Sequence, residues 1–291
     1  MCDEITELEN KKYFEGGGKI NRRNFTKLSA AAILASALPS RANAADVTES
    51  RVDITTPDGT SDCYFVHPTM GAHAGVLIWP DIKGLRPAYE AMGRRLAEDG
   101  YSVLVVNPFY RDAKAPVVEE GASFSDPDTR TLLRGMAGKL TQDASISDSI
   151  AYISFIDAQP SVDTSRKIGT TGYCMGGTLI MRTAAAVPNR VGAAASFHGG
   201  GLVSDRPDSP HLLIPKSPAH VLHCIAESDD ARDVDMKVKL KAAYDAAGVP
   251  AEIEVYEGTQ HGWCALDSAV YHEAQAEHAW SRLLNLFETA L

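Results

Sequence analysis

Short apolar runs alternate with longer segments of helical spacing from Arg51 to the end of the chain. The runs GVLIWP (75–80) and YSVLVVNP (101–108) are almost continuously apolar, which is typical of strands covered on both faces. Four more strand-like runs begin at residues 166, 191, 219 and 251, and helical spacing recurs at 86–100, 145–160, 234–248 and 271–291. This order predicts a mostly parallel sheet with helices on both faces, in one α/β domain.

Two segments depart from this alternation. RVDITT (51–56) and SDCYFVHP (61–68) flank Pro57-Asp58-Gly59, a turn signal that predicts an opening hairpin. Residues 111–140 are polar and contain two prolines and several glycines, so we expect a long excursion or cap segment there. Loops of this length inside a compact domain are commonly functional.

The N-terminal 44 residues carry features of a targeting segment. Paired arginines and an aromatic residue (RRNF, 22–25) precede a mildly apolar run at 28–38 and a small-x-small site, Ala-Asn-Ala, at 42–44. In this order the features resemble a twin-arginine export signal. The resemblance implies handling by the export machinery, cleavage after residue 44, and a periplasmic domain at 45–291.

The charge and the hydropathy of the chain argue against nucleic-acid binding and against stable membrane insertion. The chain has a net charge of −10, and its basic residues cluster only near the N-terminus, so we do not expect a nucleic-acid partner. The apolar run at 28–38 is shorter than the roughly 20 residues that a bilayer-spanning helix needs, so we expect no stable membrane insertion. Hydrophobic residues make up 44% of the chain, which is enough for a sizeable core.

Four cysteines lie beyond the N-terminal segment. They are widely spaced: Cys63, Cys174, Cys224 and Cys264. The chain is large enough to fold without disulfide cross-links, so we expect no structural disulfide. Cys63 and Cys224 stand in strand-like stretches and are predicted core residues. Cys174 differs from them because glycines surround it.

Cys174 lies in the segment IGTTGYCMGG, between a strand-like run and a helical one. Gly172-Tyr173-Cys174-Met175-Gly176 has the G-x-nucleophile-x-G spacing of the nucleophile elbow, with cysteine where serine is commoner. The sharp turn needs glycines two residues either side so that strand and helix approach closely. A helix N-terminus behind Cys174 favours its thiolate.

A histidine and a carboxylate complete a candidate triad. His261 follows the last predicted strand and precedes the terminal helix, and we prefer it to His198, which follows an earlier strand. Four acidic residues follow the strand at 219–226, and of these we select Asp229, with Asp230 as the alternative. The chain order nucleophile, acid, histidine is that of the α/β-hydrolase fold.

Five sequence pieces together resemble the dienelactone hydrolase family across residues 52–291: GYCMGG, WPDIKGLRP, GYSVLVVNPFYR, AESDD and HGW. The resemblance implies an α/β-hydrolase fold and a cysteine hydrolase that opens a lactone or ester through a thioacyl-enzyme, without metal or cofactor. It makes Cys174 the nucleophile, His261 the base and later acid, and Asp229 its orienting partner. The backbone N–H groups of Ile82 and Met175 would form the oxyanion hole.

The sequence departs from the family pattern at two places. A glutamate of the early loop, which helps to control the resting thiol in the family, is replaced by the shorter Asp81. The family's arginine just past the histidine is absent from HGWCALDS, although Trp263 stands there as a candidate substrate contact. Arg130 or Arg134, in the polar excursion, could supply the family's other arginine.

Two other functions compete with hydrolysis. Cys174 could pair with Cys264 as a thiol-redox centre, although the chain has no C-x-x-C motif. The chain could also be a hydrolase-fold binding protein without turnover, with the excursion at 111–140 closing its pocket. An intact triad favours the enzyme over both.

Overall fold

The computed structural model describes residues 44–291, and the predicted export signal lies outside the described residues. Its eight-stranded sheet has the order β1-β2-β4-β3-β5-β6-β7-β8. The strands are β1 (Val47–Thr56), β2 (Gly59–Pro68), β3 (Gly75–Trp79), β4 (Ser102–Val105), β5 (Ile168–Tyr173), β6 (Val191–Phe197), β7 (His220–Ala226) and β8 (Ala251–Tyr256). β1 and β2 form the predicted hairpin, and from β4 to β8 every neighbouring pair is parallel.

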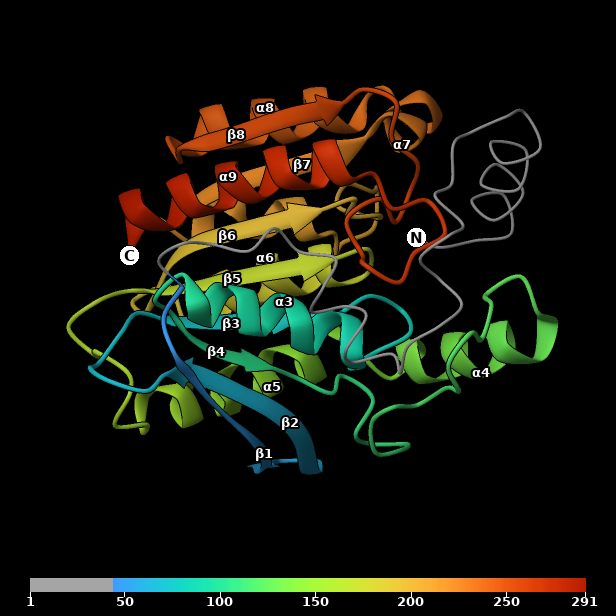
Figure 1. The fold of residues 1–291 in the computed structure, drawn as a ribbon. Coiled ribbons are helices and arrows are strands. Elements are labelled where there is room, and N and C mark those ends of the chain that lie inside the picture. Colours follow the sequence, from blue (N-terminus) through green and yellow to red (C-terminus); the bar gives the residue numbers. More distant parts are fainter. Residues whose placement is uncertain (1–43) are drawn as a thin grey trace.

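Helices cover both faces of this sheet, so the predicted α/β architecture is confirmed (Figure 1). One face carries α3 (Pro87–Glu98) and α9 (Glu273–Ala290), which lie in front of the strands in this view. The other face carries α5 (Gln142–Asp157), α6 (Gly176–Ala186) and α8 (Met236–Ala247). The remaining helices are α4 (Pro127–Gly138), the short α7 (Glu227–Arg232) and the 3-10 helix η2 (Pro210–Lys216).

Side chains of the central strands alternate between two apolar cores. Val76 and Ile78 of β3 pack with α3 and α9, whereas Leu77 and Trp79 pack with α5 and α6. Every residue of β3, β4 and β5 is buried, as expected of strands covered on both sides. This packing fixes the carboxyl ends of the parallel strands, which is where an open α/β sheet collects its ligands.

The excursion at 111–140 contains a helix that the sequence analysis did not predict. α4 begins with Pro127 after Asp126, whose side chain accepts a hydrogen bond from the Thr129 N–H at 2.8 Å. Of its twelve residues only Leu133 and Met136 are buried, so its apolar spacing is sparse. In Figure 1, α4 lies beyond the carboxyl ends of the central strands.

No helix within residues 44–291 is both long and apolar enough to cross a bilayer. The four cysteines of this range are thiols, as the sequence predicts. Cys63 and Cys224 are fully buried in the two cores, also as predicted.

Candidate active site

Cys174 stands on a tight turn between β5 and α6. Its φ of 55° is in the left-handed region, which costs a non-glycine residue about 1–3 kcal/mol. Two backbone hydrogen bonds hold the turn: the Cys174 N–H donates to the Phe197 carbonyl at 3.0 Å, and the Gly177 N–H donates to the Cys174 carbonyl at 3.1 Å. The neighbouring structure therefore imposes the strained conformation, as at a nucleophile elbow.

Two glycines make the elbow possible through close approach. A Cβ on Gly172 would lie 2.2 Å from the Gly176 carbonyl oxygen, and one on Gly176 would lie 2.5 Å from the Trp79 carbonyl oxygen. Real Cβ atoms do not come so close to backbone oxygens. Strand β5, helix α6 and the end of β3 thus pack backbone to backbone around Cys174.

The buried His261 pairs with the partly buried Asp229 and faces this turn. The Nδ1 atom of His261 lies 2.8 Å and 3.0 Å from the two carboxylate oxygens of Asp229. The His261 N–H donates to Ser228 Oγ at 3.0 Å, which fixes the histidine loop against α7. Asp230, the alternative acid, accepts instead from Lys237 Nζ at 2.6 Å.

The ionisation of this pair follows from its neighbours. Burial alone would lower the pKa of His261, but the charges of Asp229 and Cys174 and hydrogen bonds with both side chains raise it to about 10. Burial raises the pKa of Asp229, but the charge of His261 and its hydrogen bond outweigh burial and hold that pKa below the usual value. The geometry therefore favours an imidazolium between a carboxylate and the Cys174 sulfur.

His198, the alternative histidine, lies beside the pair without replacing His261. Its ring is edge-on to the His261 ring, with centroids 5.0 Å apart, and its φ is 40°. Its Nδ1 is buried and has no hydrogen-bond partner in the described chain. Burial, with the charge of His261, lowers the pKa of His198 to about 4, so this imidazole is neutral at neutral pH.

Ile82 and Met175 flank the elbow at the strand ends. Ile82 follows the end of β3 by three residues, and Met175 is the N-cap of α6. In the described chain, neither N–H donates a hydrogen bond to another protein group. The oxyanion hole that the sequence analysis expected from these two N–H groups stays a prediction.

Comparison with known proteins shows the family of the chain. The model of the dienelactone hydrolase family matches residues 62–291. The chain belongs to the dienelactone hydrolase family. Family membership makes it a hydrolase of carboxylic esters or lactones. A relative from Rhodococcus opacus, named carboxymethylenebutenolidase, is 27% identical over 240 residues, which are 80% of this chain and 88% of the relative.

Solved structures of this family share the fold. A dienelactone hydrolase from Anabaena variabilis superposes with a TM-score of 0.62 at 16% identity, over 84% of this chain and 99% of the other. A dienelactone hydrolase-like promiscuous phosphotriesterase from metagenomic libraries gives a TM-score of 0.68 at 22% identity, over 84% and 98% of the two chains. At these identities the likeness shows the fold.

The residues at which this chain departs from the family pattern have defined places. Asp81 is buried, and Arg86 pairs with both its carboxylate oxygens at 2.6 Å and 2.8 Å. Arg130 and Arg134 lie on α4, where Arg130 reaches the Ser125 carbonyl and Arg134 lies 5.7 Å from the centre of the Phe124 ring. The structure therefore places neither α4 arginine in contact with the triad.

Trp263 does not line an open surface. Its side chain is fully buried and stacks on Tyr256, with ring centroids 4.7 Å apart. Its ring is part of the core shared by β8 and α9. The substrate contact that the sequence analysis expected from this residue stays a prediction.

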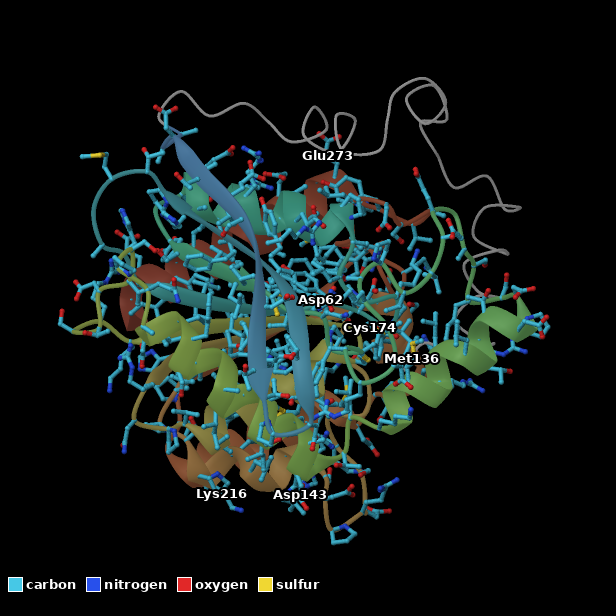
Figure 2. All side chains as sticks on the ribbon, turned by 90° about the horizontal axis from the view of Figure 1, so that it is seen from below. Asp62, Met136, Asp143, Cys174, Lys216 and Glu273 are labelled. Atoms are coloured by element: carbon cyan, nitrogen blue, oxygen red, sulfur yellow. The ribbon has the colours of Figure 1, made fainter. Side chains whose placement is uncertain are left out.

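The excursion covers the elbow with apolar side chains. Phe124 and Leu133 form a small core with Ile82, and Met175 packs against it. Near this small core, Cys174 is 1% exposed and His261 is 3% exposed. In Figure 2, Cys174 lies amid packed side chains, whereas Lys216, Asp143 and Glu273 lie at the periphery.

Sequence reasoning missed three contributors to the site. Ser228 anchors the histidine loop, the Phe124–Leu133 pair forms the cover, and Arg86 links Asp81 to Asp267. Arg86 offered a weak signal, since it is a charge directly before Pro87 at the start of a buried helix. Within residues 44–291, no group of three or more His, Cys, Asp or Glu side chains has a metal-binding arrangement.

Proposed function

We propose that this protein hydrolyses a carboxylic ester or lactone through a thioacyl-enzyme on Cys174. His261 transfers the protons and Asp229 holds its ring. The observation that carries the proposal is the Asp229–His261 pair directed at a cysteine in a left-handed elbow. The turn itself has no other evident reason to place a strained, non-glycine residue there.

The first half-reaction starts from a thiolate–imidazolium pair. The Cys174 sulfur attacks the substrate carbonyl carbon, and the carbonyl electron pair moves to oxygen, where the N–H groups of Ile82 and Met175 donate hydrogen bonds to the oxyanion. Collapse of this intermediate breaks the C–O bond, and the His261 imidazolium gives its proton to the leaving alkoxide. In a lactone the leaving hydroxyl stays attached to the acyl group.

In the second half-reaction His261 acts as a base, whereas it acted as an acid in the first. Acylation removes the negative charge on sulfur, which is one of the causes that raise the pKa of His261. Neutral His261 then takes a proton from water as the hydroxide attacks the thioester carbon. The C–S bond breaks, the carboxylic acid departs, and the Cys174 thiolate and the His261 imidazolium are restored. Each oxyanion donor contributes about 10²–10³-fold to rates of this kind.

Trapping the acyl-enzyme tests the proposal. The protein is incubated with a panel of lactones and activated esters, and intact mass is followed for an acyl adduct on Cys174. The variant Cys174→Ala should show neither adduct nor p-nitrophenyl acetate hydrolysis, nor labelling by iodoacetamide at this position. Cys264→Ala is the matched control and should keep all three. Full activity in Cys174→Ala would overturn the nucleophile assignment.

The redox alternative has less support. Burial raises the pKa of the Cys264 thiol well above its usual value, which makes it a poor partner for thiol–disulfide exchange. Counting free thiols on the purified protein separates the two functions, because a redox pair loses two thiols on oxidation. A binding protein without turnover is separated by the trapping experiment itself.

A further inference from the structure

The guanidinium group of Arg86 donates all of its hydrogen bonds to other groups of the protein. Its Nε donates to Asp267 at 2.6 Å, and one terminal nitrogen donates to Asp81 at 2.6 Å and to the Gly84 carbonyl at 3.1 Å. The other terminal nitrogen donates to Asp81 at 2.8 Å and to Asp267 at 3.0 Å. All five N–H donors of Arg86 are therefore satisfied, and the residue is only 8% exposed.

The two carboxylates that Arg86 joins belong to the two loops of the site. Asp81 directly precedes Ile82, and its own side chain also accepts the Lys83 N–H at 2.8 Å, which shapes the turn after β3. Asp267 lies in the loop between His261 and α9. The ion pairs thus tie a proposed oxyanion donor to the loop of the proposed acid–base residue.

We propose that Arg86 is a positioning residue that holds the Ile82 loop and the His261 loop in register for the reaction. We call Asp81, Arg86 and Asp267 the Arg86 clamp. The inference rests on the proposed function, because it assigns the clamp to the same oxyanion hole and histidine. Since its donors are all occupied, Arg86 does not bind the substrate, and Asp81 is engaged by the clamp rather than by the thiol.

The geometry of the clamp explains why an arginine stands at this position. A guanidinium can meet two carboxylates edge to edge, each through two N–H groups, and it keeps its charge at any pH that the protein tolerates. Burial raises the energetic cost of the charged form of Arg86, but the charges of Asp81 and Asp267 hold its pKa well above the usual value. A lysine at this position would carry the positive charge, but its ammonium group could not donate paired N–H groups to two carboxylates.

The alternative is that the clamp only stabilises the fold, and the chain offers a matched control for that case. Arg95 of α3 pairs through two N–H groups with Glu277 of α9 at 2.7 Å and 2.6 Å, and it is 5% exposed. Each arginine also lies over an aromatic ring, Arg86 at 4.8 Å from Tyr89 and Arg95 at 4.2 Å from Trp280. The Arg95 pair joins two helices, and its hydrogen bonds go to Glu277 rather than to either loop of the site.

The experiment compares the variants Arg86→Met and Arg95→Met. Two readouts report on the site, and the unfolding midpoint reports on the stability of the fold. The first readout is the kcat and KM for a neutral p-nitrophenyl ester, and the second is the pH midpoint for iodoacetamide alkylation of Cys174. We expect similar losses of unfolding midpoint in both variants. We expect about a 10- to 100-fold loss of kcat with little change in KM, and a raised alkylation midpoint, only in Arg86→Met.

Asp267→Asn keeps the inference testable if Arg86→Met does not fold, because its side chain is at the edge of the clamp and 28% exposed. It should lower kcat and raise the alkylation midpoint in the same direction, and Arg86→Lys should not restore kcat. Equal effects of Arg86→Met and Arg95→Met on both readouts would overturn the clamp. If wild-type protein shows no ester turnover, the proposed function fails, and the alkylation midpoints alone then decide the clamp.

Discussion

At the scale of single residues, the site depends on which of two adjacent aspartates reaches His261. Asp229 and Asp230 both start α7, but only Asp229 lies against the imidazole, while Lys237 holds Asp230. A short helix turns successive side chains by about 100°, so neighbours in sequence face different surroundings. The sequence could limit the candidate acid to the four acidic residues that follow β7. Only the fold shows which of Asp229 and Asp230 contacts His261.

Replacement of Asp229 by asparagine should lower kcat far more than replacement of Asp230. Asparagine removes the charge and permits the wrong imidazole tautomer, which costs triads of this kind about 10⁴-fold in kcat. Asp230→Asn is the matched control and should stay within about threefold of wild type, because the carboxylate of Asp230 pairs with Lys237 and not with His261. Steady-state hydrolysis of an activated ester measures both, and equal losses would contradict the assignment.

The same pair gives the stability of the protein a defined pH dependence. Folding raises the pKa of His261 to about 10, so its stabilising contribution is complete below the unfolded pKa near 6.5 and is lost as pH rises through about 10. Folding lowers the pKa of Asp229, so its contribution is present above the unfolded pKa near 4 and is lost as pH falls through the lower folded value. The full contribution therefore lies between about pH 4 and 6.5.

Urea unfolding of wild type and Asp229→Asn at pH 5.5 and pH 10.5 measures this dependence. The difference in unfolding free energy between the two proteins should be larger at pH 5.5, by about 1–3 kcal/mol. Asp230→Asn should show no such change between the two pH values. A wild-type advantage that is the same at both would show that the charges of Asp229 and His261 do not contribute.

At the scale of elements, helix α6 must start against the end of β3 to aim Cys174. Gly176→Ala places a Cβ against the Trp79 carbonyl oxygen, so we expect about 1–3 kcal/mol of destabilisation, measured by urea unfolding. Gly135→Ala in α4 is the control, because nothing lies within 4 Å of its added Cβ and alanine favours a helix by about 0.5–1 kcal/mol. A neutral Gly176→Ala would contradict the backbone contact.

Shortening Leu133, which packs with Phe124 and Ile82, should make Cys174 more accessible to a labelling reagent. Leu133 is fully buried against Ile82, whereas its neighbour Leu132 is 47% exposed. Leu133→Ala should raise the rate of iodoacetamide labelling of Cys174, by about tenfold for each ~1.4 kcal/mol of cover packing lost. Leu132→Ala should leave the labelling rate unchanged, and an equal rate in both variants would show that the cover does not limit access.

The elements that sequence patterns predicted are those with strong local signals. Gly248 ends α8 in a left-handed conformation, and Pro57-Asp58-Gly59 marks the turn of the β1–β2 hairpin, where Thr56 pairs with Gly59. Helix α4 was missed because its buried residues are too few to set a period, although Asp126-Pro127 was a readable cap. A cap without periodicity was read as part of a loop.

At the scale of the whole molecule, the arrangement of the site comes from strand order. Cys174 and Asp229 follow β5 and β7, and His261 follows β8, so parallel pairing brings three distant segments to one edge of the sheet. That much the sequence predicted from chain order. The Arg86 clamp could not be predicted, because 181 positions separate its arginine from Asp267 and neither residue has a local pattern that points to the other.

The destination of the whole chain remains a prediction from its first 44 residues. Replacing Arg22 and Arg23 together by lysine keeps the charge but removes the arginine pair, so the uncleaved chain should accumulate inside the producing cell. Lys11→Arg with Lys12→Arg is the control and should leave export unchanged. Fractionation with N-terminal sequencing measures both, and a mature protein that does not begin at Ala45 would contradict the cleavage site.

Burial of the Cys174 sulfur also bears on how long the protein survives oxidants. Thiolates react with peroxides to form sulfenic and then irreversible sulfinic acids, and the rate depends on exposure as well as on charge. On the proposed function, Cys174 is a thiolate, and at 1% exposure it meets peroxide only when the protein around it opens. The opening that admits substrate therefore also sets the lifetime of the nucleophile.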